Sequence, residues 1–377
     1  MHSLDPLACA TRRKRLWDAL PKPCDALILG DPQSLIYFAN HAPSPFVFRT
    51  SDAAALLVLT PDRATLVADA MVKGYAAEAH VDDRVLPVWY DGKHSAPHRR
   101  ALLLKTALEV VGARQATRWG AESSVVPLGM ASALGEPLAI DTIVRGLRRR
   151  KDPDEVALIR ASARAGEAGH RAALAGIHSG MTELDAYRVV QNASIWNAGE
   201  PVIVYGDFAS GPRCVTDRGG PPTQRMIEPG DLFLLDYSVV IRGYRADFTN
   251  TFVVDGGPTA SQKTLFDACL AALAAGESVL KPGVLAREVD RSVRAALAER
   301  GLEHAFPSHS GHGLGLSHPE PPYLVAESDD TLLEGDVVAL EPGLFVPEVG
   351  GMRFERNYLI TRDGFECLTH HRLTLER

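Results

Sequence analysis

Two aspartates on a predicted hairpin are the first residues in this sequence that could carry chemistry. A two-residue turn at 242–243 between two apolar strands places Asp247 opposite Ser238. Because side chains alternate along a strand, Asp236 shares the face of Ser238 and is a diagonal neighbour of Asp247. Two carboxylates on one otherwise apolar face repel each other unless a positive charge lies between them, which favours a divalent cation. The alternative is a polar strand face open to solvent.

Further motifs downstream offer complementary ligands. His312 stands among the glycines of 311–316, where the backbone allows close approach, Glu341 follows the apolar run 337–340, and Glu355 lies fourteen residues later. The glycines around His312 lack the spacing and the βαβ context of a dinucleotide-binding loop. A single histidine beside glycine is most often structural, so its interest depends on the acidic residues that accompany it.

The elements that position these residues follow from capping signals and periodicity. Asp152 and Glu155 form a capping box that begins one helix, and Thr182 with Asp185 begins the next. These helices are predicted to end near 180 and 199, with later helices at 261–280 and 286–300. Strands are predicted at 201–205, 232–241, 244–254, 313–316, 337–340 and 357–361. Two helices followed by strands therefore occur twice, which predicts a pseudo-duplicated α+β domain over 151–377.

The first part of the chain is predicted to be a smaller α/β domain over 1–145. Its expected strands are 26–29, 53–59 and 64–67, and its expected helices are 71–79 and 99–111. The boundary is placed near 141–151, where the apolar pattern thins and arginines cluster. The two short basic runs, 12–15 and 148–151, are interpreted as solvated faces.

Composition limits the possible partners. The 377 residues include 40 Lys+Arg and 47 Asp+Glu, and a formal net charge of −7 argues against nucleic acid or an anionic membrane as the main partner. No run approaches the ~18 apolar residues of a membrane span, and residues 1–16 lack the apolar core of a secretory signal. The five cysteines are scattered without CxxC spacing, which predicts reduced cytoplasmic thiols and no thiolate zinc site.

The ordered acidic and imidazole residues resemble the five-ligand signature of the pita-bread metallopeptidase family, which includes Xaa-Pro dipeptidase (prolidase), aminopeptidase P, methionine aminopeptidase and creatinase-like hydrolases. The matching stretches are Leu-Leu-Asp at 234–236, Ala-Asp-Phe-Thr-Asn-Thr-Phe at 246–252, Gly-His-Gly-Leu-Gly at 311–315, Glu-Pro-Gly at 341–343 and Gly-Met-Arg-Phe-Glu at 351–355. Residues 11–140 also resemble the N-terminal domain of the prolidase and creatinase branch, which methionine aminopeptidases lack. The resemblance therefore implies the pita-bread fold behind a creatinase-type N-terminal domain.

The resemblance also implies a dinuclear metal-dependent hydrolase that cleaves the bond before proline with a metal-bridging hydroxide. In the family pattern one metal is held by Asp236, both are bridged by Asp247 and Glu355, and the other is held by His312 and Glu341. Glu341 is then the catalytic base or proton shuttle. Four carboxylates balance two divalent cations, and oxygen-rich ligation with one nitrogen favours Mn²⁺ over Co²⁺, Fe²⁺ or Zn²⁺. Members of this branch are commonly homodimers, so a homodimer is expected.

Two departures from the family pattern concern substrate-binding positions. Gly219 stands where prolidases usually carry a substrate-side histidine, and His318 follows His312 by six residues rather than seven. His318 is nevertheless expected to reach the site, orient the substrate and stabilise the oxyanion. Arg353 is expected to bind a substrate carboxylate or to pair with a ligand carboxylate, and Tyr244 to support substrate binding through a hydrogen bond.

Alternatives to a peptidase remain open from the sequence. The glycine at 219 favours a creatinase-like or ectoine-hydrolase-like enzyme that hydrolyses a small non-peptide C–N bond. Creatinase works without metal, however, whereas all five ligand positions are retained here. A non-catalytic binding protein built on the same fold is a further alternative, and it predicts that no metal copurifies. A cysteine or serine nucleophile is disfavoured, because Cys214 has no adjacent base and the sequence contains no G-x-S-x-G motif.

Overall fold

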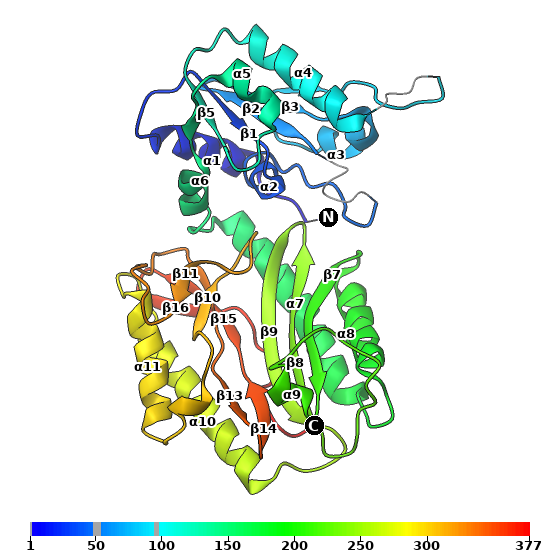
Figure 1. Cartoon of the computed structure of the whole chain (residues 1–377), viewed down its shortest axis with the longest axis vertical. Coiled ribbons are helices and arrows are strands. Elements are labelled where there is room, and N and C mark those ends of the chain that lie inside the picture. Colours follow the sequence, from blue (N-terminus) through cyan, green and yellow to red (C-terminus); the bar gives the residue numbers. More distant parts are fainter. Residues whose placement is uncertain (1, 48–53, 94–97) are drawn as a thin grey trace. The chain divides into compact units, whose positions relative to one another are not determined.

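A computed structural model describes residues 2–47, 54–93 and 98–377 and divides the chain into two compact units (Figure 1). The first unit is Met1–Arg148 and the second is Arg149–Arg377. All five cysteines are free thiols. Within the described ranges, none of the helices combines the length and apolar character needed to cross a bilayer.

The first unit is built on a six-stranded sheet in which the strands predicted at 26–29, 53–59 and 64–67 are neighbours. The strand order is β4(Asp83–Val85), β3(Arg63–Val67), β2(Leu56–Thr60), β1(Ala26–Leu29), β5(Trp119–Ala121) and β6(Leu138–Ala139). The strands β1, β2 and β3 pair antiparallel, whereas β4, β5 and β6 join in parallel. The predicted strand 53–59 begins in the sequence at Ala53, which lies outside the described residues.

Short helices complete this unit. They are α1(Pro6–Asp18), α2(Pro32–Ala39), η1(Ala70–Val72), α3(Lys73–Ala77), α4(Arg99–Ala113), η2(Leu128–Met130), α5(Ala131–Leu134) and α6(Asp141–Leu147). The helix predicted at 71–79 is a 3₁₀ turn followed by a five-residue α-helix. Asp69 caps this segment by accepting a hydrogen bond from the Met71 backbone, and Gly74 lowers its helical propensity.

The first basic run is a solvated face only in part, because Arg12 is fully buried whereas Lys14 is exposed. Its guanidinium carbon lies 5.0 Å from the centroid of the Tyr37 ring, which is a cation–π contact. The run of charges in the sequence gives no sign of this aromatic partner, which comes from α2.

The second basic run is also largely buried, although its residue Arg150 is exposed. Arg149 forms an ion pair with the buried carboxylate of Asp336 at 2.7 Å, and Lys151 forms one with Glu320 at 2.6 Å. The prediction of a solvated face was wrong for Arg149 and Lys151, because their acidic partners lie about 170 to 190 residues further along the sequence. These pairs fix the start of the second unit to its own strands.

The second unit repeats one arrangement of helices followed by strands, as its sequence predicts. Its first half contains α7(Pro153–Gly176), α8(Glu183–Ala198), β7(Ile203–Ser210), α9(Arg213–Thr216), β8(Leu232–Ile241) and β9(Tyr244–Val253). Its second half contains α10(Ala260–Glu277), α11(Ala286–Ala298), η3(Glu303–Ala305), β10(Gly311–Gly313), β11(Glu320–Leu324), β12(Val337–Leu340), β13(Gly343–Val346), β14(Gly350–Arg353), β15(Arg356–Thr361) and β16(Gly364–Cys367).

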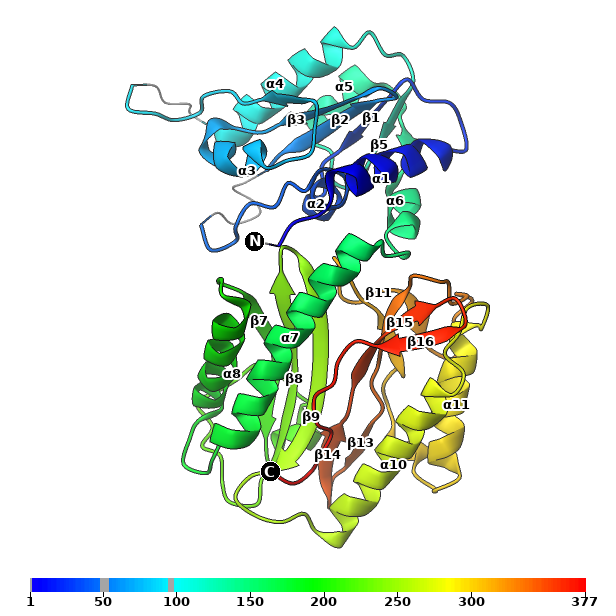
Figure 2. The ribbon, with the colours of Figure 1, turned by 180° about the vertical axis from the view of Figure 1, so that it is seen from behind.

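The strands of the second unit form antiparallel sheets with the orders β7-β8-β9, β11-β10-β12-β15-β16 and β13-β14. The strands β8 and β9 lie in front of α7 in Figure 1 and behind it in Figure 2, so this helix covers one face of the first sheet. Contact between them is close at Gly166, where an added Cβ would fall 2.2 Å from the Phe248 ring. The opposite face of β8 and β9 is left for the acidic side chains.

Both predicted capping boxes are present, at Asp152 with Glu155 and at Thr182 with Asp185. Several element boundaries differ from the prediction, and the strand predicted at 313–316, for example, is β10(Gly311–Gly313). Helix α7 ends at Gly176, because the next residue turns to an extended backbone. Strand β7 continues to Ser210, five residues beyond its predicted end, because it pairs with β8 along its whole length.

Candidate metal centre

The register of β8 and β9 agrees with the predicted hairpin. Ser238 pairs with Asp247, and Asp236 pairs with Thr249. The Ser238 hydroxyl donates to Asp247 Oδ1 at 3.1 Å, so both side chains share one face. Asp236 and Asp247 are therefore diagonal neighbours, and each offers a carboxylate oxygen within 4.8 Å of one on Glu355.

Glu355 comes from the second half of the unit, between β14 and β15, and is almost fully buried at 1% exposure. Its backbone N–H donates to the Thr249 carbonyl at 3.1 Å, and the Thr249 hydroxyl donates to Glu355 Oε2 at 2.6 Å. The Asp247 backbone N–H in turn donates to Asn357 Oδ1 at 2.8 Å. These hydrogen bonds join strand β9 to the second half of the unit at the position where the carboxylates meet.

His312 and Glu341 form the second part of the cluster. His312 lies on β10, and its Nε2 is 3.2 Å from Oε1 of Glu341, which directly follows β12. The strands β10 and β12 are hydrogen-bonded neighbours, which explains how residues almost thirty positions apart meet. A further imidazole, that of His309, places its Nε2 3.0 Å from the same Glu341 oxygen.

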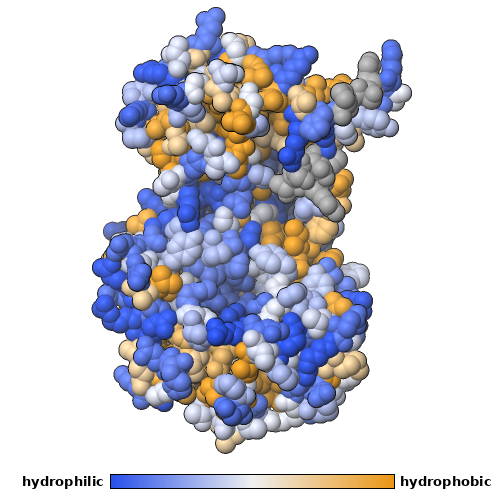
Figure 3. Space-filling view, viewed as in Figure 1, coloured by the Kyte–Doolittle hydropathy of each residue, from blue (hydrophilic) through white to orange (hydrophobic). Residues whose placement is uncertain are grey.

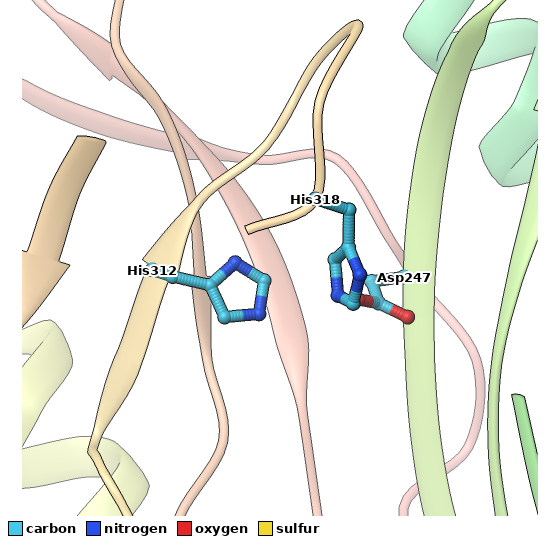
Figure 4. A group of neighbouring side chains, drawn as sticks. All are labelled: Asp247, His312 and His318. Atoms are coloured by element: carbon cyan, nitrogen blue, oxygen red, sulfur yellow. The ribbon is translucent and has the colours of Figure 1, made fainter. Parts of the chain in front are cut away.

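His318 reaches the cluster despite its shortened spacing from His312. Its Nε2 lies 2.6 Å from Asp247 Oδ2, and its ring centroid lies 4.7 Å from that of His312. Figure 4 shows both imidazoles directed toward Asp247 on β9, His312 from β10 and His318 from the loop that follows it. In Figure 3 the surface between β9 and β10 is largely hydrophilic.

Arg353 also lies in the cluster, with its side chain 14% exposed. Its Nη1 donates a hydrogen bond to Asp236 Oδ2, and its Nε lies 3.6 Å from Glu341 Oε2. The structure thus brings Arg353 against two of the predicted ligand carboxylates.

Tyr244 is not brought to the cluster, which corrects its predicted role in substrate binding. It is fully buried, and its hydroxyl donates to Glu155 Oε1 at 2.9 Å near the start of α7. The physical reason is strand alternation, because Tyr244 and Asp247 are three residues apart and so point to opposite faces of β9.

The electrostatics of the carboxylates reflect their crowding. Burial raises the pKa of Asp236 to about 7, against the opposing charge of Arg353. Burial likewise raises the pKa of Glu355 well above its usual value, and the charges of Asp247 and Glu341 add to that rise. At both positions, burial makes the charged form of the carboxylate costly.

The pKa values of the two carboxylates next to imidazoles, Asp247 and Glu341, are lowered instead. Burial alone would raise the pKa of Asp247, but the hydrogen bond and charge of His318 bring it below its usual value. The pKa of Glu341 falls well below normal in spite of burial, because His309 and His312 donate to it. Burial alone would lower the pKa of His312, but Glu341 outweighs it and raises the pKa to about 9.

This donor set fits divalent cations. Three carboxylates gather at Asp236, Asp247 and Glu355, and an adjoining group combines Glu341 with two imidazoles, the ligand atoms of each group lying within 4.8 Å of one another. Carboxylate oxygens with imidazole nitrogens suit Mn²⁺, Fe²⁺, Co²⁺ and Zn²⁺. A cation would supply the positive charge that the raised pKa values of Asp236 and Glu355 call for.

Two residues of the site were missed from the sequence. His309 could have been found from its position three residues before His312. Asp207 lies on β7 directly opposite Asp236, and it was missed because the predicted strand ended at 205. Asp207 Oδ2 is 3.9 Å from Arg353 Nη1.

Comparison with known proteins identifies two domains. Residues 157–362 match the model of metallopeptidase family M24, and residues 12–149 match the creatinase/prolidase N-terminal domain. A Xaa-Pro dipeptidase of Pyrococcus horikoshii is 33% identical over 231 residues, which cover 61% of this chain and 65% of that protein. An uncharacterised peptidase of Staphylococcus aureus is 28% identical over 237 residues, which cover 62% of this chain and 66% of that protein. The chain thus spans just under two thirds of the length of these relatives.

Solved structures match over nearly the whole chain. The prolidase from Pyrococcus horikoshii has a TM-score of 0.80 at 26% identity, covering 97% of this chain and 99% of that one. A Xaa-Pro dipeptidase from Bacillus anthracis shares the fold, with a TM-score of 0.81 at 24% identity, covering 98% of this chain and 99% of that one. These likenesses confirm the predicted α+β pita-bread fold, preceded in the sequence by a smaller α/β domain. Because the peptidase model covers more than half of its residues, this chain belongs to metallopeptidase family M24.

Proposed function

We propose that the chain is a dinuclear metal-dependent hydrolase that cleaves the bond before proline, as a Xaa-Pro dipeptidase or aminopeptidase. The observation that carries the proposal is the convergence of carboxylates from both halves of the second unit with the imidazole of His312. The likeness to relatives described as Xaa-Pro dipeptidase and prolidase supports the same activity.

The proposed ligand roles follow the two groups of side chains. One ion would be held by Asp236, the other by His312 and Glu341, and Asp247 and Glu355 would serve as ligands of both. The short distances among the carboxylates and between His312 and Glu341 support this arrangement. We propose two ions per chain and favour Mn²⁺, because most of the donors are carboxylate oxygens.

Bound divalent ions would supply Lewis-acid activation of water and of the scissile carbonyl. The side chains of the protein would transfer protons, contact the substrate and position the ligands. Glu341 carries protons, with His309 Nε2 at 3.0 Å as its neighbour. His318 contacts Asp247 through Nε2 and presents the rest of its partly exposed ring to the substrate. Arg353 positions Asp236 by donating to it.

The remaining proposals concern the whole protein. An N-terminal domain over 1–145 and a catalytic domain over 151–377 are supported by the division into compact units between Arg148 and Arg149. A homodimer in the cytoplasm, acting on a small peptide, is proposed from the resemblance to the prolidase branch.

The test is a panel of Xaa-Pro dipeptides on Mn²⁺-loaded protein, with elemental analysis of bound metal. We expect hydrolysis with two equivalents of metal per chain. Asp247→Ala should lower kcat by roughly 10³-fold or more, since it removes a buried bridging ligand. Asp255→Ala, an exposed aspartate paired with Arg377 just beyond β9, is the matched control and should retain activity. Loaded wild-type protein that cleaves none of several Xaa-Pro dipeptides would reject the proposal.

A second candidate is hydrolysis of a small non-peptide C–N bond, as in creatinase-like enzymes. The observation that favours it is at Gly219, where an added Cβ would fall 2.1 Å from Asp207 Oδ2, so this position has no room for a substrate-contacting side chain. Turnover of ectoine or creatine without any turnover of dipeptides would select this candidate.

A further inference from the structure

Asp207 is a carboxylate of the site that the proposed ligand set does not use. It lies on β7 in register with Asp236, and residues directly opposite in an antiparallel pair share a face. Its side chain therefore lies on the face that carries the metal-binding carboxylates, and it is 33% exposed. A substrate that enters the cluster from solvent can reach it.

The charge of Asp207 is not neutralised by a hydrogen-bonded cation. Among the residues that the structure describes, Arg353 is the one cation recorded within 4.0 Å of this carboxylate, and its Nη1 is 3.9 Å away. That nitrogen donates instead to Asp236. The backbone N–H of Gly220 is the hydrogen-bond donor to Asp207, and it carries no net charge.

The loop over Asp207 leaves space for its carboxylate. Gly219 has a φ of +135°, a conformation that glycine adopts readily, and a Cβ there would fall 2.1 Å from Asp207 Oδ2. The Phe208 backbone N–H donates to the Gly220 carbonyl at 2.9 Å and holds the loop against β7. The carboxylate thus occupies the place of a side chain at 219.

The surroundings of Asp207 suit an organic cation. Four ligand carboxylates would be balanced by two divalent ions, and Arg353, the nearby cation, donates to Asp236 rather than to Asp207. Tyr205, two residues earlier on the same face of β7, is 38% exposed, and its ring centroid lies 6.4 Å from that of His318. Its hydroxyl accepts from Arg245 Nη1 at 2.7 Å, and the guanidinium carbon of Arg245 is 6.0 Å from the ring centroid. A carboxylate beside an exposed aromatic ring is an arrangement that binds alkylammonium groups.

We propose that Asp207 is a specificity-determining residue that binds an alkylammonium group of the substrate, an inference that rests on the proposed dipeptidase function. The ammonium is either the N-terminal amine of the substrate or the side chain of a lysine before proline. Both are protonated amines on an aliphatic carbon, and they differ only in their distance from the scissile bond.

Three ligands distinguish these sources on the Mn²⁺-loaded full-length protein. Lysyl-proline and norleucyl-proline differ in the side-chain ammonium, and hexanoyl-proline lacks the α-amine of norleucyl-proline. The measurements are kcat/KM for both dipeptides and the inhibition constant of hexanoyl-proline against norleucyl-proline hydrolysis. They are made on wild type, Asp207→Asn, Asp207→Glu and the control Asp217→Asn, an exposed aspartate that pairs with Arg213.

For a side-chain subsite, wild type prefers lysyl-proline at least tenfold and Asp207→Asn abolishes that preference. For an N-terminal subsite, Asp207→Asn lowers kcat/KM at least tenfold for both dipeptides alike and leaves inhibition by hexanoyl-proline unchanged. In both cases Asp207→Glu, which keeps the charge, retains more of the effect than Asp207→Asn, and Asp217→Asn behaves as wild type.

Two results overturn the inference while the proposed function stands. One is an Asp207→Asn enzyme of unchanged metal content with unchanged kcat/KM for both dipeptides. The other is equal weakening of hexanoyl-proline and norleucyl-proline, which would mean that Asp207 only supports the shape of the site. Loaded wild type that cleaves neither dipeptide overturns the proposed function, and this inference with it.

Discussion

At the residue scale, the Thr249 hydroxyl is the hydrogen-bond donor that holds one carboxylate oxygen of Glu355. Thr249 donates to Glu355 Oε2 at 2.6 Å, and both residues are buried. Thr249→Val keeps the shape of the side chain and removes its hydroxyl donor. Oε2 of Glu355, a proposed metal ligand, is then no longer held in place. We expect metal affinity to fall about 10–100-fold, measured by competition with a chelator.

Thr251→Val is the matched control on the same strand. The Thr251 hydroxyl contacts the backbone of Arg353 and no ligand carboxylate. A Thr249→Val protein that binds metal no more weakly than Thr251→Val would show that the hydrogen bond does not position the ligand.

The proposed ligands could be predicted from the sequence because each stands in a short motif of its own. Asp207 has no such motif, and its position in the site depends on β7 continuing past Gly206, where pairing with β8 supplies the backbone hydrogen bonds. Tyr244, in contrast, was wrongly assigned to the site. It is near Asp247 in sequence, but strand alternation directs it to the opposite face of β9, where its hydroxyl contacts Glu155.

At the scale of elements, α7 approaches β9 through a glycine. A Cβ on Gly166 would lie 2.2 Å from the Phe248 ring, next to Asp247. Gly166→Ala gains about 1 kcal/mol of helix propensity but overpacks a buried contact at a cost of about 1–3 kcal/mol. We therefore expect net destabilisation, seen as a lower midpoint of urea unfolding.

Gly176→Ala provides the comparison within the same helix. The nearest atom to its Cβ, on Val189, is at an ordinary contact distance of 3.7 Å. This variant should be neutral or slightly more stable than wild type. Equal stability of the two alanine variants would contradict the close approach of α7 and β9.

Helices and strands were predictable where local signals agree. The capping boxes of α7 and α8 identify both helix starts, and the bounds of β8 and β12 follow from apolar runs. The end of α7 was not predictable, because residues 177–180 carry no strong helix breaker before the glycine at 180. The buried ion pair of Lys151 with Glu320 depends on tertiary contact, which no local pattern reveals.

At the scale of the whole molecule, two buried histidines make the second unit sensitive to acid. His170 and His371 lie edge to face with ring centroids 4.9 Å apart. Burial lowers the pKa of His170 from 6.5 to about 4 and that of His371 well below 6.5. As pH falls from about 6.5 toward 4, the unfolded chain therefore binds protons that the folded chain does not.

Stability should accordingly decrease over that range, with His170 alone contributing about 3 kcal/mol at about 1.4 kcal/mol per pKa unit. His170→Gln should flatten the fall of the urea midpoint between pH 6.5 and 4. The exposed His178→Gln is the control and should keep the wild-type slope. Identical slopes for all three proteins would exclude His170 as the cause.

The ion pairs of Arg149 with Asp336 and of Lys151 with Glu320 limit where the polypeptide can be cut. A fragment that starts at residue 152 would keep every proposed ligand. It would, however, leave the buried carboxylates of Asp336 and Glu320 without their cations. Leaving a buried charge unpaired costs about 3–5 kcal/mol, a large part of the stability of an ordinary domain. Expression of the peptidase half by itself should therefore start no later than Arg149.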